Sequence, residues 1–161
     1  MYVYLPELGK ARRVTTSQVR GKLLGSDFSY DELQRVFAQA GEIGVQRLPD
    51  AQQDGRAAYS LEAKPPPGAG SSYTRVTSLI DRETCVPLEI DFYETADTPR
   101  KRITVDPARI TREGEVNVPR LVTIRDLEKG TESRLVTHEI EIDPDLSDSM
   151  FLPATIEAKK P

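Results

Sequence analysis

Residues that commonly carry chemistry are scarce in this sequence. His138 is the single histidine and Cys85 the single cysteine among 161 residues. His138 falls on the apolar side of an alternating pattern, so it could be a polar anchor at an apolar cavity or a catalytic base. The first role is favoured because the sequence has no Gly-x-Ser-x-Gly elbow. Cys85 and His138 could form a nucleophile and base, but a buried or half-buried inert thiol is the simpler interpretation. We therefore expect a non-enzymatic protein with no catalytic residue, metal or cofactor.

Charged clusters offer two further candidate sites. The acidic stretch 143–148 resembles the start of a calcium loop, but Asp148 stands where glycine is required and Ala154 where the closing carboxylate is required, which favours a solvated turn. Basic clusters could contact lipid head groups or an acidic partner, or could be solvated strand edges; they are Lys10, Arg12 and Arg13, and Arg100, Lys101 and Arg102. Nucleic-acid binding is not expected, because the net charge is -4 and tryptophan is absent.

Alternation of apolar and polar residues indicates the elements that would position these groups. The pattern predicts strands over 57–63, 86–92 and 136–143, with weaker candidates over 2–5, 12–20, 73–81, 100–105 and 118–125. The intervening turn-forming stretches are too short for a crossover helix, so neighbouring strands must run antiparallel; these stretches are 65–72, 96–99, 112–115 and 128–131. We expect one face of this sheet to be apolar and the other to be wet.

One helix is well specified by the sequence. Ser29 and Glu32 fit a capping box, Phe28 can pack onto Leu33 as a staple, and apolar residues then recur at three- and four-residue spacing to a glycine stop, which predicts a helix over 30–40. A second helical turn is expected over 146–151. The fold class is therefore mainly β (α+β), with few helices.

A sheet with so little helix leaves apolar surface to be covered. Only 37% of the residues are hydrophobic, which indicates a thin core, and no apolar run approaches the roughly 18 residues that cross a bilayer. An exposed apolar face requires a partner subunit, a missing segment or an apolar ligand. The candidate apolar ligand-binding residues, for which ordinary core is the alternative, are Tyr59, Leu61, Leu88, Ile90, Phe92, Val136, His138, Ile140, Met150 and Phe151.

Several segments resemble the bacterial outer-membrane lipoprotein-sorting family (LolA-like). They begin with Tyr-Leu-Pro-Glu-Leu-Gly-Lys at 4–10 and Leu-Gly-Ser-Asp-Phe-Ser-Tyr-Asp-Glu-Leu at 24–33, and they continue at 80–88, 92–94 and 149–153. The resemblance implies a curved, unclosed antiparallel sheet, a half-barrel, with one or two short helices on its concave face. It also implies a single domain over 1–161 that lacks the helix and first strands with which family members usually begin.

The resemblance implies a function as well. It predicts a periplasmic binding or carrier module for lipid, a lipoprotein acyl chain or a similar apolar ligand. The alternative is a protein–protein interaction module of an envelope export or efflux system that carries no lipid. The expected partners are lipid or an acylated lipoprotein, with envelope transport proteins and a homodimer as further candidates and nucleic acid excluded.

Overall fold

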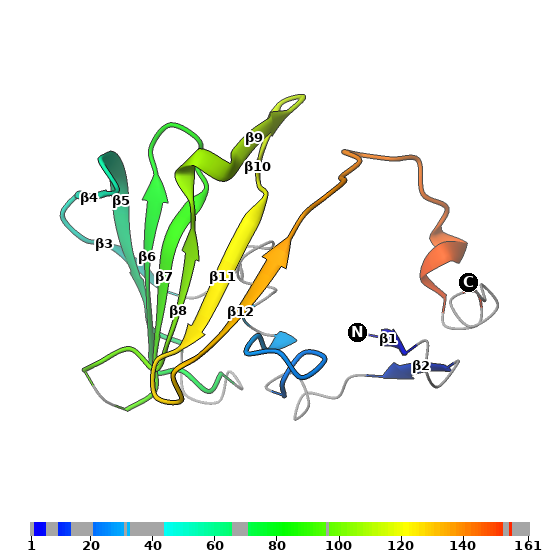
Figure 1. Cartoon of the computed structure of the whole chain (residues 1–161), viewed down its shortest axis with the longest axis horizontal. Coiled ribbons are helices and arrows are strands. Elements are labelled where there is room, and N and C mark those ends of the chain that lie inside the picture. Colours follow the sequence, from blue (N-terminus) through cyan, green and yellow to red (C-terminus); the bar gives the residue numbers. More distant parts are fainter. Residues whose placement is uncertain are drawn as a thin grey trace.

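The protein is built around one large antiparallel sheet. The computed structural model describes residues 2–5, 10–13, 21–30, 32, 44–65, 71–95, 97–152 and 155. Neighbouring strands follow the order β12-β11-β8-β7-β6-β5-β3, and β4 also pairs with β5 (Figure 1). The sheet is not closed into a barrel, because β12 and β3 stand at its two edges. Its strands are β3 (Val45–Arg47), β4 (Ala51–Gln53), β5 (Arg56–Ala63), β6 (Arg75–Asp81), β7 (Pro87–Tyr93), β8 (Lys101–Val105), β11 (Leu121–Asp126) and β12 (Thr131–Val136).

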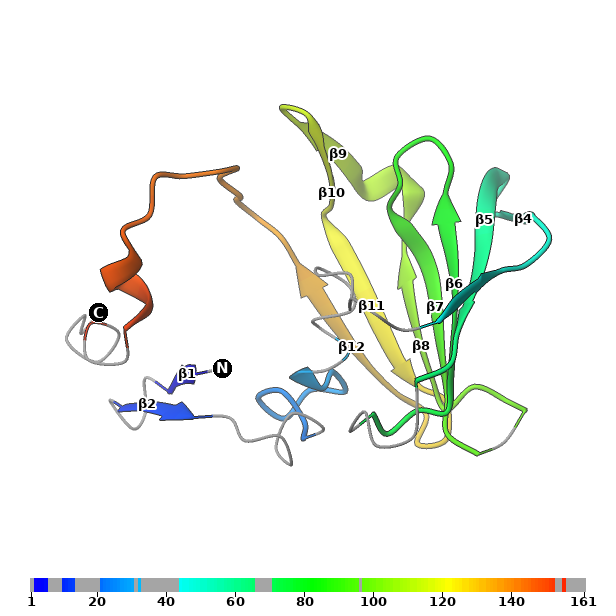
Figure 2. The same cartoon turned by 180° about the vertical axis from the view of Figure 1, so that it is seen from behind.

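Smaller elements lie outside this sheet. Strands β9 (Ile110–Glu113) and β10 (Val116–Pro119) form a separate hairpin between β8 and β11, preceded by the short helix η2 (Pro107–Arg109). Strands β1 (Tyr2–Leu5) and β2 (Lys10–Arg13) pair only with each other in the described part of the chain. After β12 the chain leaves the sheet and reaches the short helix η3 (Asp148–Phe151), on the side where β1 and β2 lie (Figures 1 and 2).

The two faces of the sheet differ in character, as the alternation predicts. Ile90 pairs with Ile103, and Ile103 pairs with Ile124, so one face carries an apolar row across β7, β8 and β11. The next residues point to the opposite face and are charged, because alternate residues of a strand face opposite sides. There the Arg102 guanidinium donates two hydrogen bonds to Asp91, both 2.7 Å long. We call the apolar side the inner face and the charged side the outer face.

Most of the predicted strands are confirmed. The alternation at 57–63 and 86–92 corresponds to β5 and β7, and the weaker candidates at 73–81 and 100–105 correspond to β6 and β8. The candidate at 118–125 is divided between β10 and β11. The candidate at 12–20 is described only at Arg12 and Arg13, which end β2.

The predicted strand over 136–143 is wrong. The last strand is β12, which occupies 131–136 and pairs with all of β11, from Thr131 opposite Asp126 to Val136 opposite Leu121. Val136 pairs with Leu121, which is the first residue of β11. The alternating residues after Val136 therefore have no β11 residue opposite them and continue without a partner in the described sheet. Sequence alternation shows that a segment can pair but does not show where its partner ends.

The helix predictions are confirmed at their described positions. Tyr30 and Glu32 are helical, and the capping box is formed, because Ser29 N–H donates to the Glu32 carboxylate at 2.6 Å and Glu32 N–H donates to Ser29 Oγ at 3.2 Å. The rest of the predicted helix, including Leu33, lies outside the described residues. The predicted turn over 146–151 is η3. Within the described part, no helix is long and apolar enough to span a bilayer.

Candidate apolar binding face and the polar cluster beside it

The inner face is the main apolar surface of the sheet. Its buried residues come from four adjacent strands and form one cluster with Phe28, Tyr73 and Val86. Phe92 and Ile124 are fully buried, and Ile103 is 1% exposed. The strand residues of the cluster are Val76, Ile90, Phe92, Ile103, Val105, Val122 and Ile124.

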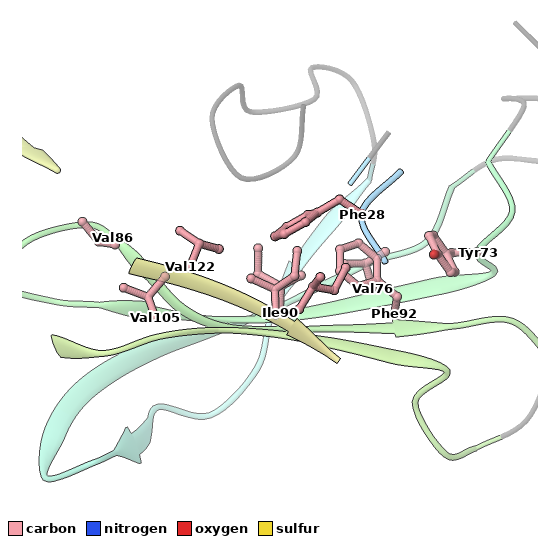
Figure 3. Close-up of a cluster of buried hydrophobic side chains, with 10 residues drawn as sticks. Phe28, Tyr73, Val76, Val86, Ile90, Phe92, Val105 and Val122 are labelled. Carbon is pink, nitrogen blue, oxygen red and sulfur yellow. The ribbon is translucent and has the colours of Figure 1, made fainter. Parts of the chain in front are cut away.

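Phe28 lies over this face. Its side chain is 4% exposed and stands on the same side of the sheet as Ile90 and Val122 (Figure 3). Beside it the rings of Tyr73 and Phe92 lie 4.9 Å apart in a tilted arrangement. The segment 21–30 therefore covers part of the inner face with the ring of Phe28, the residue that precedes the capping box.

A cluster of polar side chains holds this segment against the sheet. Glu32 is fully buried, accepts a hydrogen bond from the Tyr73 hydroxyl and pairs with Lys101 Nζ at 2.9 Å. The same ammonium donates to the backbone carbonyl of Asp27 at 2.7 Å. Burying a carboxylate is costly unless it is paired and hydrogen-bonded, and Glu32 meets both conditions. We call Asp27, Glu32, Tyr73, Lys101, Thr131 and Ser133 the polar cluster.

Asp27 extends the cluster to the edge strand β12. Its carboxylate accepts hydrogen bonds from Thr131 Oγ1 at 2.8 Å and Ser133 Oγ at 2.9 Å, and its backbone N–H donates to Ser133 Oγ at 2.9 Å. Burial raises the pKa of Asp27, but the two hydroxyl donors and the nearby Lys22 outweigh it, so the pKa lies below its ordinary value. Asp27 is therefore an anion in this position at neutral pH.

The basic residues at 100–102, for which a head-group or acidic-partner contact and a solvated strand edge were both open, form ion pairs within the protein. Arg100 pairs with Asp126, Lys101 with Glu32 and Arg102 with Asp91, and these three carboxylates are buried. Successive residues of the strand take these cations to different faces, so they do not form one surface for head groups. The other predicted basic cluster lies in β2, whose side chains lie outside the described residues.

Six predicted ligand-binding residues lie on the large sheet, and five of them are buried or half-buried. Leu88, Ile90 and Phe92 are buried in β7, and Ile90 and Phe92 belong to the inner-face cluster. Tyr59 and Leu61 are half-buried in β5. Tyr59 is bracketed by two cations, with the Arg47 guanidinium 4.7 Å and the Arg82 guanidinium 5.0 Å from its ring centre. Its ring is therefore occupied by surface cation–π contacts.

The sixth is the exposed Val136, and the remaining predicted residues lie outside the sheet. Val136 ends β12, while His138 and Ile140 follow it and Met150 and Phe151 lie in η3; all five side chains are exposed. His138 is thus not on a strand, although its carbonyl accepts a hydrogen bond from Arg120 at 3.4 Å.

Cys85 is exposed, which contradicts the expectation of a buried or half-buried thiol. It lies in the turn between β6 and β7 with a φ of 58°, and its N–H donates to the Asp81 carbonyl at 2.9 Å. No group of three or more metal-ligating side chains occurs among the described residues.

Two kinds of residue in this region were not predicted. Ile103, Val122 and Ile124 complete the inner face, and the alternation within 100–105 and 118–125 could have identified them. The polar cluster had no such signal, because its members are joined by contacts across 69 residues between Lys101 and Glu32 and 106 residues between Ser133 and Asp27.

Comparison with solved structures identifies the fold. A domain from Vibrio parahaemolyticus, assigned to the outer-membrane lipoprotein-sorting proteins, superposes with a TM-score of 0.81 at 20% identity, over 97% of this chain and 65% of its own. A DUF1329 family protein from Desulfovibrio piger superposes with a TM-score of 0.85 at 22% identity, over 96% of this chain and 63% of its own. A LolA superfamily protein from Nitrosomonas europaea superposes with a TM-score of 0.66 at 19% identity, over 94% of this chain and 65% of its own. The chain thus spans just under two thirds of the length of these structures.

Comparison of sequences gives the family. None of the curated proteins compared with the chain matches it. A family model with the description "Uncharacterized protein" matches residues 1–158, which is nearly the whole chain. The unclosed antiparallel sheet and the superpositions agree with this match. The chain belongs to this family, and its fold is that of the LolA-like, outer-membrane lipoprotein-sorting proteins.

Proposed function

We propose that this chain is a non-enzymatic, periplasmic binding module that carries a lipid, a lipoprotein acyl chain or a similar apolar ligand against the inner face of its sheet. The observation that carries the proposal is the inner face itself, an apolar surface of four strands in a sheet that does not close. The likeness in fold to lipoprotein-sorting proteins supports the same function and the same compartment.

The position of Phe28 suggests how a ligand would enter. An acyl chain on the inner face would take the place of the Phe28 ring, which lies over Ile90 and Val122. Covering a few hundred Å² of apolar surface contributes several kcal/mol at about 25 cal/mol per Å², before the cost of ordering the ligand. Ligand binding would then require the Phe28 side chain to turn away from the inner face while the polar cluster keeps the segment 21–30 in place.

Uptake of a fluorescent fatty acid by the purified full chain tests this proposal. We expect saturable binding, and we expect Phe28→Ala to strengthen it because the replaced ring no longer competes for the inner face. Ile90→Glu should abolish binding, since a carboxylate at this buried position repels an apolar chain. Native mass spectrometry after detergent-free purification would show whether a lipid-sized mass accompanies the protein.

The matched control is Thr104→Ala, a half-buried strand position on the outer face that pairs with Glu89. It should bind the probe as the unaltered protein does. Circular dichroism must show that the Ile90→Glu variant remains folded. No uptake by the unaltered protein, or equal uptake by a folded Ile90→Glu variant, would contradict the proposal.

A further inference from the structure

The segment after β12 has the sequence of a strand but no strand partner among the described residues. Residues 137–152 form what we call the C-terminal arm. Ile140 and Ile142, which are 44% and 37% exposed, alternate with Glu139, Glu141 and Asp143. The last backbone hydrogen bond to the body of the protein is from Thr137 N–H to the Arg120 carbonyl at 3.0 Å. Among the described residues, none joins 139–146 to another segment.

An extended segment of this kind can receive another strand. Its unpaired N–H and C=O groups form a template for strand addition, and its alternating apolar side chains supply one face for contact. Exposed apolar residues continue along the arm to its end, at Leu146, Met150, Phe151 and Leu152. Both the backbone and the side chains of the arm are therefore available to a partner.

The charge of the arm restricts what this partner can be. The arm contains five carboxylates and neither lysine nor arginine, so its net charge is -5 with His138 neutral. In the described part of the chain none of the five has an ion-pair partner. Like charges directly opposite each other destabilise a strand pair, whereas opposite charges stabilise it. A second arm is therefore a poor partner, and a cationic strand is a good one.

The chain itself carries such a strand. The hairpin of β1 and β2 has the residues Tyr-Val-Tyr-Leu in the first strand and Lys-Ala-Arg-Arg in the second. Residues 2–13 carry three positive charges, all in β2, and one negative charge, Glu7. In the described part of a single chain it pairs only with itself, so neither of its strands has a second strand partner there.

We propose that two copies of this chain form a symmetric dimer in which the β1–β2 hairpin of each copy adds to the C-terminal arm of the other. Because each chain has one hairpin and one arm, the two contacts are equivalent and close the assembly at two subunits. Strand β2 of each copy, which contains Lys10, Arg12 and Arg13, then lies along the partner's arm, whose net charge is -5. This interface is separate from the inner face and does not depend on ligand binding.

Charge reversal tests the proposal in analytical ultracentrifugation of the full chain. We expect a dimer at low salt that dissociates as salt rises, because the contact is exposed and screened. Arg12→Glu with Arg13→Glu should raise the dimer dissociation constant at least about tenfold, and so should Glu139→Lys with Glu141→Lys. An equal mixture of the two variants should dimerise more strongly than either variant alone, because each mixed dimer brings one unaltered hairpin against one unaltered arm.

Matched controls are Arg109→Glu and Glu115→Lys, which alter exposed residues whose side chains have no ion-pair partner in the described part of the chain. Neither should change the dissociation constant, and circular dichroism should show all variants folded. The proposal is overturned by a chain that stays monomeric at its highest soluble concentration. A dimer that either reversal leaves intact, or a mixture of the two variants that dimerises no better than either alone, overturns it equally.

Discussion

Glu32 and Lys101 are two charges removed from water that depend on each other. The Glu32 side chain is fully buried and that of Lys101 is 15% exposed. Lys101→Met would leave a buried carboxylate with only its neutral donors, Tyr73 and Ser29 N–H. Breaking a buried pair in this way costs about 3 to 5 kcal/mol, so we expect a free energy of unfolding lower by that amount in urea denaturation.

Lys64→Met is the matched control for this prediction. Lys64 Nζ lies 3.0 Å from Glu62, but the lysine side chain is 66% exposed, and Glu62 keeps a second cation, Arg75, at 3.7 Å when the pair is lost. Its removal should change the unfolding midpoint little. Equal effects of the two substitutions would mean that burial of Glu32 does not govern the strength of its ion pair.

Asp81 should make the stability depend on acid pH. Two hydrogen bonds from the Arg56 guanidinium, at 3.0 and 2.7 Å, and donors from Thr84 outweigh burial and hold the pKa of Asp81 at about 2, below its ordinary 3.8. The unfolded chain therefore binds this proton more readily, and the stabilisation present above pH 3.8 is lost as the pH falls towards 2.

Urea denaturation at a series of pH values checks this expectation. Arg56→Met should weaken the decline between pH 3.8 and 2, because the folded-state pKa of Asp81 would rise towards its unfolded value. Arg47→Met, which removes an exposed partner of Asp50, is the control and should leave most of the decline in place. An unchanged decline after Arg56→Met would assign it to other carboxylates.

At the scale of single elements, the turn between β11 and β12 depends on one glycine. Gly130 has a φ of 68°, and its N–H donates to the Asp126 carbonyl at 2.9 Å. Gly130→Ala should lower the free energy of unfolding by about 1 kcal/mol, because a Cβ disfavours this left-handed conformation. No atom lies within 4 Å of the added Cβ, so the loss is conformational. Gly130→Asn should lose less in the same measurement, since asparagine tolerates the conformation, and equal losses would argue against this cause.

The elements also show what sequence patterns can predict. Strands β5 and β7 were recognisable because their partners lie within one hairpin, and the capping box of Ser29 and Glu32 needs only four residues. The extent of β12 was not recognisable, because it is set by the length of β11 rather than by residues 136–143. The polar cluster was missed for a related reason. Glu32, Lys101 and Ser133 acquire their roles only when distant strands come together.

At the scale of the whole molecule, the sheet and the C-terminal arm should differ in resistance to proteolysis. Glu139 and Glu141 are exposed and lie in a segment without backbone hydrogen bonds to the sheet, whereas Glu89 lies inside the paired strand β7. At low protein concentration and high salt, a glutamate-specific protease should cut first in the arm. Mass spectrometry of the first fragments checks this, and early cleavage at Glu89 would contradict it.

The contact of Asp27 with Thr131 and Ser133 has a consequence for the order of folding. The residues that fix Asp27 follow it by 104 and 106 positions. At about 5 to 20 residues per second, the ribosome needs roughly 5 to 20 seconds to make the intervening chain. During that time Phe28 has only part of its final apolar surroundings. The segment around Phe28 can therefore complete its contacts only after β12 has been made.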